Sequence, residues 1–168
     1  GAKTLTKFQQ TLSFYKKMTH YQAPKKLSTS KQKQLLNSVQ DKDVVFVSGD
    51  THCSWAFEVP ISPGNYNART SEGVVAVEFG TPGLTSANLD EYRSMEEVKA
   101  AEQKMHIANK HLKYLDTHSQ GYFILEMRSN QSKVDYYYID RINAESETEI
   151  KGKSIIVRKG RSQIIMGQ

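Results

Sequence analysis

Apolar residues recur at helical spacing in three stretches of the chain. They stand three or four positions apart in residues 4–18 and again in residues 31–40, which is typical of amphipathic helices. A third helix is predicted behind Ser94 and Glu97, because this pair has the spacing of a capping box. Its apolar stripe continues as far as Leu112, and packing in a core explains that stripe without a functional role.

Shorter apolar runs predict strands. Residues 44–48 and 74–79 are apolar runs of the kind found in strands, and the first is typical of a fully buried strand in a parallel sheet. Residues 120–142 resemble a β-hairpin with its turn at 129–132, and residues 154–160 predict a last strand. A helix, a short acidic turn and a buried strand in succession indicate an α/β (α+β) fold.

Length and composition place these elements in one domain. The chain has 168 residues, of which 38% are hydrophobic and 24% charged, as expected for a single globular domain. We interpret residues 1–27 as an N-terminal helix and loop, and residues 140–168 as a basic C-terminal strand and tail. We expect no membrane span, because no apolar run approaches the roughly 18 residues that a membrane helix needs.

The net charge of +5 is unevenly distributed along the chain. Residues 1–43 carry nine lysines and two aspartates, and residues 150–168 carry five basic side chains and no acidic one. Basic ends can bind anionic partners, but solvated lysines on amphipathic helices explain them equally. A nucleic-acid site is better supported by clustered arginines interleaved with aromatic residues, and these ends hold only two arginines. We therefore expect no nucleic-acid partner.

Candidate metal chemistry follows the first predicted strand. Asp50 and His52 come directly after Gly49, and side chains at i and i+2 of an extended segment share one face. The carboxyl ends of strands are where open α/β sheets bind ligands, and a carboxylate beside an imidazole suits Zn, Mn or Fe. Gly49 permits a backbone conformation that a Cβ hinders. The alternative to a metal site is that Asp50 and His52 form a structural pair or lie in a solvated turn.

Two ligands do not complete a catalytic metal site, which usually takes three or more from the protein. The chain offers further candidates, none with a distinctive spacing: Glu78, His106, His111, Asp116 and His118. The single cysteine, Cys53, is expected to be a small buried residue, and a metal ligand or reactive thiol is the alternative.

Three blocks then occur in a fixed order: "VVFVSGDTHCSW", "VAVEFGTPGLTS" and "NKHLKYLDTHSQGYFILEM". Together they resemble the C-terminal part of the alkaline phosphatase D (PhoD-like) metallophosphatases, within the calcineurin-like metallophosphoesterases. The resemblance covers residues 28–139. It implies the C-terminal half of a four-layer α/β/β/α sandwich, with a mixed sheet and flanking helices.

The resemblance also implies a two-metal centre that hydrolyses phosphate monoesters or diesters with iron and calcium, or with manganese and zinc. The family's Gly-Asp-x-His motif falls on Gly49, Asp50 and His52, so that Asp50 ligates one metal ion and His52 the other. Gly49, Trp55 and Glu78 are expected to support these ligands.

His111 and Tyr114 match the family's late motif. The resemblance implies that they line or support the substrate pocket, rather than bind metal. The alternative is that they belong to a packed helix end.

The resemblance also identifies what this stretch lacks. The family's other metal ligands belong to upstream motifs, and no acidic residue precedes Asp41. We therefore expect the chain by itself to be inactive and to bind metal weakly or not at all. Without the missing N-terminal half, the apolar face shared by the two sheets would be exposed, so self-association is expected. The parent enzyme would act on a phosphate ester and be exported, while the compartment of this chain stays open. The alternative is a non-catalytic binding module whose basic ends contact an acidic partner.

Overall fold

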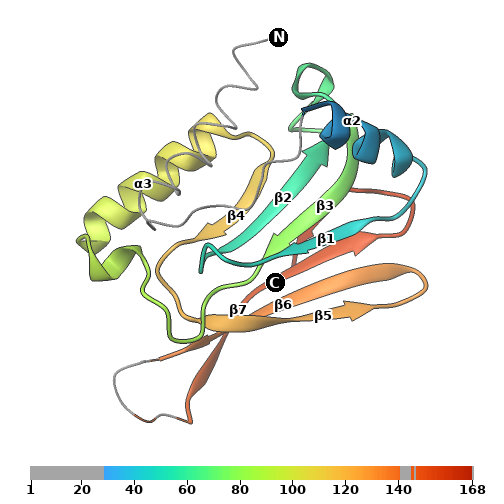
Figure 1. The fold of residues 1–168 in the computed structure, drawn as a ribbon. Coiled ribbons are helices and arrows are strands. Elements are labelled where there is room, and N and C mark those ends of the chain that lie inside the picture. Colours follow the sequence, from blue (N-terminus) through green and yellow to red (C-terminus); the bar gives the residue numbers. More distant parts are fainter. Residues whose placement is uncertain (1–28, 141–144, 146, 168) are drawn as a thin grey trace.

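In a computed structural model that describes residues 29–140, 145 and 147–167, two four-stranded sheets pack face to face, and the helices lie on the side of the first sheet (Figure 1). The predicted helix at 4–18, and with it the segment 1–27, falls outside the described residues.

The first sheet is mixed, with the strand order β1-β3-β2-β4. Its strands are β1 (Val45–Ser48), β2 (Ser54–Pro60), β3 (Val74–Gly80) and β4 (Leu112–Asp116). β1 pairs in parallel with β3, whereas the β3–β2 and β2–β4 pairs are antiparallel. The strands predicted at 44–48 and 74–79 are therefore confirmed, and so is the parallel pairing of the first of them.

β1 nevertheless lies at the edge of its sheet, and the prediction that it is fully buried was wrong. Val47 is 57% exposed, and among the described strands β1 pairs with β3 alone. A short apolar run identifies a strand, but it does not reveal how many neighbours that strand will have. An open edge leaves a row of backbone N–H and C=O groups available for pairing with another strand.

The second sheet is antiparallel throughout, with the order β5-β6-β7-β8. Its strands are β5 (Gly121–Met127), β6 (Gln131–Ile139), β7 (Glu149–Arg158) and β8 (Ile164–Met166). The predicted hairpin is β5–β6. Its turn is closed by the N–H of Arg128, which donates to the carbonyl of Gln131 at 2.8 Å, so it begins one residue earlier than predicted.

The hydrophobic core lies between the two sheets. Alternate residues of each strand point inward, as strand geometry requires. The buried residues of this core come from both sheets: Ala56, Val77, Phe79, Val134, Tyr136, Ile155, Val157 and Ile164. The face that the sheets share is therefore covered within the chain. The expectation that this face is exposed was wrong, because both of the sheets that form it belong to this chain.

The helices are α2 (Thr29–Ser38) and α3 (Met95–Ala108), and two short 3-10 turns are η1 (Pro63–Asn65) and η2 (Leu89–Glu91). α3 lies beside β4 (Figure 1), so the described elements form α/β/β layers. None of the helices in the described residues has the length and apolarity needed to cross a membrane.

α3 is shorter at its C-terminal end than its apolar stripe predicts. The helix ends at Ala108, and Leu112 is the first residue of β4. Asn109 leaves the helical conformation, and its side-chain amide donates to the carbonyl of Met105 at 2.9 Å. That bond satisfies a carbonyl at the helix end, and the chain then turns back into the sheet.

The start of α3 offers a direct test of local stabilisation. The Ser94 hydroxyl accepts from the N–H of Glu97 at 3.3 Å, and the Glu97 carboxylate accepts from the N–H of Ser94 at 3.0 Å. We expect Ser94→Ala to lower the free energy of unfolding by about 1 kcal/mol, measured by urea denaturation. Ser94→Asp, which keeps a side-chain acceptor, should stay close to wild type. Equal loss in both variants would contradict the capping explanation.

Candidate functional site

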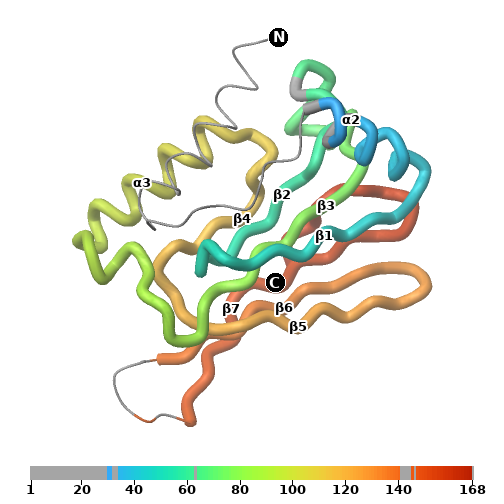
Figure 2. The backbone as a smooth tube through the Cα atoms, in the orientation of Figure 1, coloured from blue at the N-terminus to red at the C-terminus, as the bar shows by residue number. Residues whose placement is uncertain are grey.

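Three loops meet at one end of the first sheet, where β1, β3 and β4 end and β2 begins (Figure 2). They are residues 49–53, 81–88 and 117–120. A backbone hydrogen bond joins the second of these loops to the end of β1, because the N–H of Thr81 donates to the carbonyl of Ser48 at 2.9 Å. This is the end of the sheet at which the sequence places its candidate ligands.

Asp50 and His52 lie in the first of these loops, but not in an extended conformation. Their φ angles are 74° and 59°, in the left-handed region where Asp and His are enriched relative to most residues. The backbone is therefore not extended past Gly49, which is the condition for the i and i+2 rule, and that rule does not place these two side chains. Asp50 is exposed and His52 is half-buried. Their role as metal ligands stays a prediction.

Gly49 has no special backbone conformation. Its φ lies outside the left-handed region, and a Cβ added there would meet the methyl group of Thr81 at 3.5 Å, an ordinary contact. The reason that we expected for a glycine at this position was therefore wrong. The unusual conformations belong to Asp50 and His52 instead.

The loop of residues 81–88 packs directly against His52. The N–H of Gly83 donates to the carbonyl of His52 at 3.3 Å, and a Cβ at Gly83 would lie 3.2 Å from the Cβ of His52. The carbonyl of Gly83 accepts in turn from the N–H of Gly121 at 3.0 Å. Through Gly83, the position of His52 depends on the start of the second sheet.

Trp55 packs beside this end of the sheet, and its role in supporting metal ligands stays a prediction. A Cβ at Gly80 would lie 2.3 Å from the Trp55 ring, so the ring covers the last residue of β3. The hydroxyl of Tyr136 donates to the carbonyl of Trp55 at 2.6 Å, from the opposite sheet. The second sheet therefore holds the backbone directly after the loop.

Two polar atoms of this region are buried without a hydrogen-bond partner in the described part of the chain: the hydroxyl oxygen of Thr51 and the indole nitrogen of Trp55. Buried polar atoms without a partner are uncommon in folded proteins. Cys53 is buried, as predicted, and its thiol donates to the carbonyl of Thr51 at 3.1 Å.

Glu78 lies one strand away from the loop. Its carboxylate accepts a hydrogen bond from the hydroxyl of Ser48 at 2.7 Å, and Ser48 is the last residue of β1. Glu78 therefore holds the residue that immediately precedes Gly49. This contact agrees with a supporting role and gives no sign of a metal ligand.

His111 lies at the opposite end of the sheet. It precedes β4, and its ring lies 5.2 Å from that of Phe57 between ring centroids, while its carbonyl accepts from the N–H of Glu58 at 2.9 Å. Glu58 lies four residues after Ser54, the residue with which β2 begins beside the Asp50–His52 loop. This separation corresponds to about 13 Å along the sheet. Burial lowers the pKa of His111, so its imidazole is neutral near pH 7. The structure does not bring His111 to the loop of Asp50 and His52.

Tyr114 lies between the two sheets. Its hydroxyl is 2.6 Å from that of Tyr138, which donates to the hydroxyl of Ser54 at 3.0 Å. Burial raises the pKa of Tyr114 to about 12, so the phenol stays protonated at neutral pH. The chain of hydroxyls reaches the first residue of β2, and the role of Tyr114 at a substrate pocket stays a prediction.

A second group of candidate ligands meets just beyond the end of β4. One ligand atom from each of Glu102, Asp116 and His118 lies within 4.8 Å of the others. The Glu102 carboxylate raises the pKa of His118, although partial burial opposes this shift. Burial raises the pKa of Glu102, but the ion pair with His118 and the hydrogen bonds from Thr117 outweigh this effect, and the net pKa is lowered.

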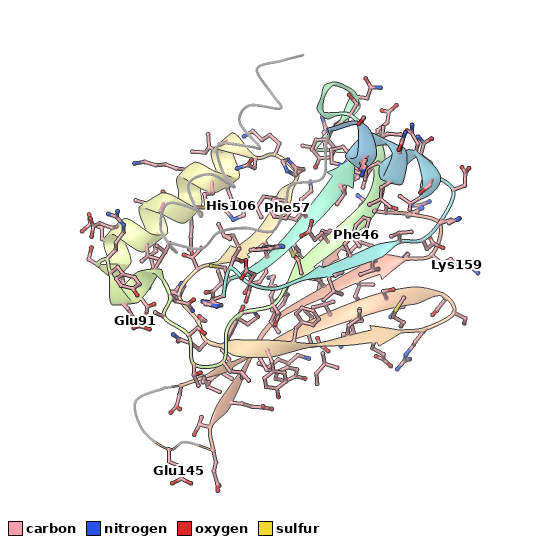
Figure 3. All side chains as sticks on the ribbon, in the orientation of Figure 1. Phe46, Phe57, Glu91, His106, Glu145 and Lys159 are labelled. Atoms are coloured by element: carbon pink, nitrogen blue, oxygen red, sulfur yellow. The ribbon has the colours of Figure 1, made fainter. Side chains whose placement is uncertain are left out.

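The sequence identified Asp116 and His118 as candidates and missed Glu102. A signal was present, because Val98, Glu102 and Met105 occupy one face of α3 at helical spacing. Val98 and Met105 are buried, so an acidic residue between them points toward the body of the protein. His106, another candidate, contacts the start of β4 instead, with its ring nitrogen 3.3 Å from the carbonyl of Leu112 (Figure 3).

These features define an α/β sandwich whose candidate ligands lie on loops at one end of a mixed sheet. The chain belongs to the PhoD-like phosphatase family, whose family model matches residues 8–136. That match begins earlier than the motif-bearing stretch of residues 28–139.

The fold is also found in a solved structure of PhoD, which matches with a TM-score of 0.65 and 18% sequence identity. The match covers 83% of this chain and 25% of that one, so this chain spans about a quarter of that protein's length. No curated protein matches the chain.

Proposed function

We propose that the chain is a segment of a metal-dependent phosphoesterase and carries part of its two-metal centre. The observation that supports this most directly is the Gly49-Asp50-Thr51-His52 loop at the strand ends of a PhoD-like fold. Family membership and the shared fold support the class of enzyme. The assignment of Asp50 and His52 as ligands, one to each metal ion, is our own inference.

The residues of the loop fit a metal centre. Asp50 supplies a carboxylate and His52 an imidazole, which suit iron, manganese and zinc, while calcium prefers the carboxylate alone. Among the described residues, the hydroxyl of Thr51 and the indole nitrogen of Trp55 are buried without a hydrogen-bond partner; Thr51 stands between the two ligands, and Trp55 follows His52 by three residues. Such atoms are consistent with a loop that is completed by groups outside the described residues.

When bound, two metal ions orient a phosphate ester, lower the pKa of a water nucleophile and neutralise developing charge. The task of this chain is to hold the ligands in place. Gly83 packs on His52, Glu78 fixes the end of β1 through Ser48, and the Tyr136 hydroxyl fixes the backbone of Trp55. Ligands held in this way lose little free energy to reorganisation.

The chain alone is expected to be inactive, because a two-metal centre needs more ligands than this loop supplies. The remaining ligands would come from another part of the same enzyme, which would also supply the substrate pocket. The open edge of β1 is a place where that part can add a strand.

The test is carried out in the longest natural polypeptide that contains this chain. We expect Asp50→Asn and His52→Ala each to lower kcat/KM for p-nitrophenyl phosphate or bis(p-nitrophenyl) phosphate by about 100-fold or more. Bound metal, measured by elemental analysis, should fall in parallel. His106→Gln is the matched control, because the structure places His106 against β4, and it should retain activity.

Hydrolysis and metal content that survive both loop substitutions would contradict the proposed ligands. A polypeptide that shows no hydrolysis, yet binds an acidic protein partner equally well with both substitutions, would instead support the non-catalytic module.

A further inference from the structure

Three side chains that the proposed phosphoesterase site does not use converge where α3 meets the end of β4. Glu102 comes from α3, Asp116 is the last residue of β4, and His118 follows two residues later. β4 is the edge strand opposite β1 in the first sheet. The group therefore lies at the same end of the sheet as the Asp50–His52 loop, but beyond the other edge.

Two of the three donor–donor distances match those of ligands around one ion, and all three donor atoms lie within 4.8 Å of one another. The Nδ1 atom of His118 lies 3.3 Å from a carboxylate oxygen of Asp116 and 3.5 Å from one of Glu102. Ligands about 2.0–2.2 Å from a tetrahedral zinc ion are about 3.3–3.6 Å apart. No rearrangement of the backbone is needed to bring these donors together.

The Nδ1 atom of His118 faces both carboxylates. It is shielded from solvent and forms ion pairs with Glu102 and Asp116, without a well-aligned hydrogen bond to either. An imidazole nitrogen in that position is a suitable metal donor.

Local hydrogen bonds hold both carboxylates in place. Glu102 accepts from the N–H and the hydroxyl of Thr117 at 2.8 and 2.9 Å. Asp116 accepts from the N–H groups of His118 and Ser119 at 3.0 and 2.8 Å. Ligands restrained by their neighbours in this way bind metal without a large loss of side-chain freedom.

The charge of the group also favours a cation. Two carboxylates surround a single imidazole, and Asp90 acts on the same imidazole from a greater distance. A divalent ion would balance the two carboxylates with a neutral imidazole as the third ligand.

We propose that Glu102, Asp116 and His118 bind one divalent transition-metal ion of the zinc type, in a structural site that joins α3 to the end of β4. Two carboxylates and one imidazole are all donors that zinc accepts, and open positions can be filled by water. This site is independent of the phosphoesterase proposal, because it shares no ligand with the Asp50–His52 loop.

The test uses the chain itself and Zn²⁺ alone. Isothermal titration in a phosphate-free, non-chelating buffer should show one bound ion per chain, which Glu102→Gln and His118→Ala each weaken by about 100-fold. Co²⁺ should give a visible absorption band that both substitutions abolish. A chain that binds no Zn²⁺, or that binds it equally well after both substitutions, would overturn the proposal.

Two control variants separate this site from its surroundings. Thr117→Val removes a hydrogen bond to Glu102 but no ligand, so Zn²⁺ binding should persist if the folded structure, checked by circular dichroism, is intact. Asp50→Asn combined with His52→Ala should also leave Zn²⁺ binding unchanged. If Zn²⁺ binding were lost in that double variant but kept in Glu102→Gln and His118→Ala, the structural site would be overturned. The ion would then belong to the proposed catalytic loop instead.

Discussion

Glu58→Ala should destabilise the folded chain by about 3–5 kcal/mol, the usual effect of breaking a buried ion pair. Glu58 is completely buried, and Lys113 lies 3.2 Å from its carboxylate. The same carboxylate accepts from the hydroxyls of Tyr66 and Ser71 at 2.8 and 2.7 Å, and from the N–H of Ile164 at 3.0 Å. Alanine would remove the acceptor of these hydrogen bonds and leave the half-buried Lys113 without its ion-pair partner.

The contacts of Glu58 join three parts of the protein that are distant in sequence. Tyr66 and Ser71 belong to the loop after β2, Lys113 to β4, and Ile164 to β8 in the second sheet. Losing the carboxylate therefore weakens the attachment of a loop and of the second sheet together.

Thermal or urea denaturation measures the effect. Glu58→Gln should fall between wild type and alanine, because the amide oxygen can still accept hydrogen bonds but no longer carries a charge opposite Lys113. Glu72→Ala is the matched control: this glutamate lies on the same loop but is exposed, and its loss should cost less than about 0.5 kcal/mol. If Glu58→Ala resembled Glu72→Ala, the carboxylate would not organise this region.

Gly121→Ala is the second substitution with a large expected effect, a loss of about 3 kcal/mol or more. A Cβ at Gly121 would lie 2.0 Å from the carbonyl oxygen of Tyr137 on the neighbouring strand. The obstacle is backbone rather than the end of a flexible side chain, so the β5–β6 pairing must shift. Overpacking alone commonly costs about 1–3 kcal/mol, and disruption of the strand pairing adds to it.

The substitution should also disturb the candidate site. The N–H of Gly121 donates to the carbonyl of Gly83, whose own N–H donates to the carbonyl of His52. We therefore expect the parent enzyme with Gly121→Ala to lose both thermal stability and bound metal. Gly64→Ala is the control, because a Cβ there would have only the hydroxyl of Ser62 within 4 Å, at 3.9 Å. Wild-type stability in Gly121→Ala would show that the strands tolerate the methyl group.

The strands found by pattern share a simple feature: their local sequence agrees with their environment. The sequence of β3 alternates little between apolar and polar residues, and the strand is buried along most of its length. The β5–β6 hairpin has a polar turn between apolar runs. The capping box of α3 needs only two residues three positions apart. Such features depend on neighbours in sequence, and this is why pattern alone predicted them.

β2 escaped prediction because its buried face is the less hydrophobic one. Ser54, Ala56 and Glu58 point inward and are fully buried, whereas Trp55 and Phe57 on the other face are only half-buried. The polar groups are tolerated inside because partners from other strands satisfy them, as Tyr138 does for Ser54. Hydrophobic alternation read from one segment cannot include partners that lie elsewhere in the chain.

The features of the candidate site also fall into two groups, those that depend on local sequence and those that depend on distant parts of the chain. The sequence by itself determined the Gly-Asp-x-His loop after a strand, the resemblance to PhoD-like phosphatases and the α/β class, since each depends on residues in fixed local order. Only the tertiary structure decided that β1 lies at an edge and that His111 lies at the far end of the sheet. It alone brought Glu102 to Asp116 and His118, because strand order and helix packing result from long-range contacts that no local pattern contains.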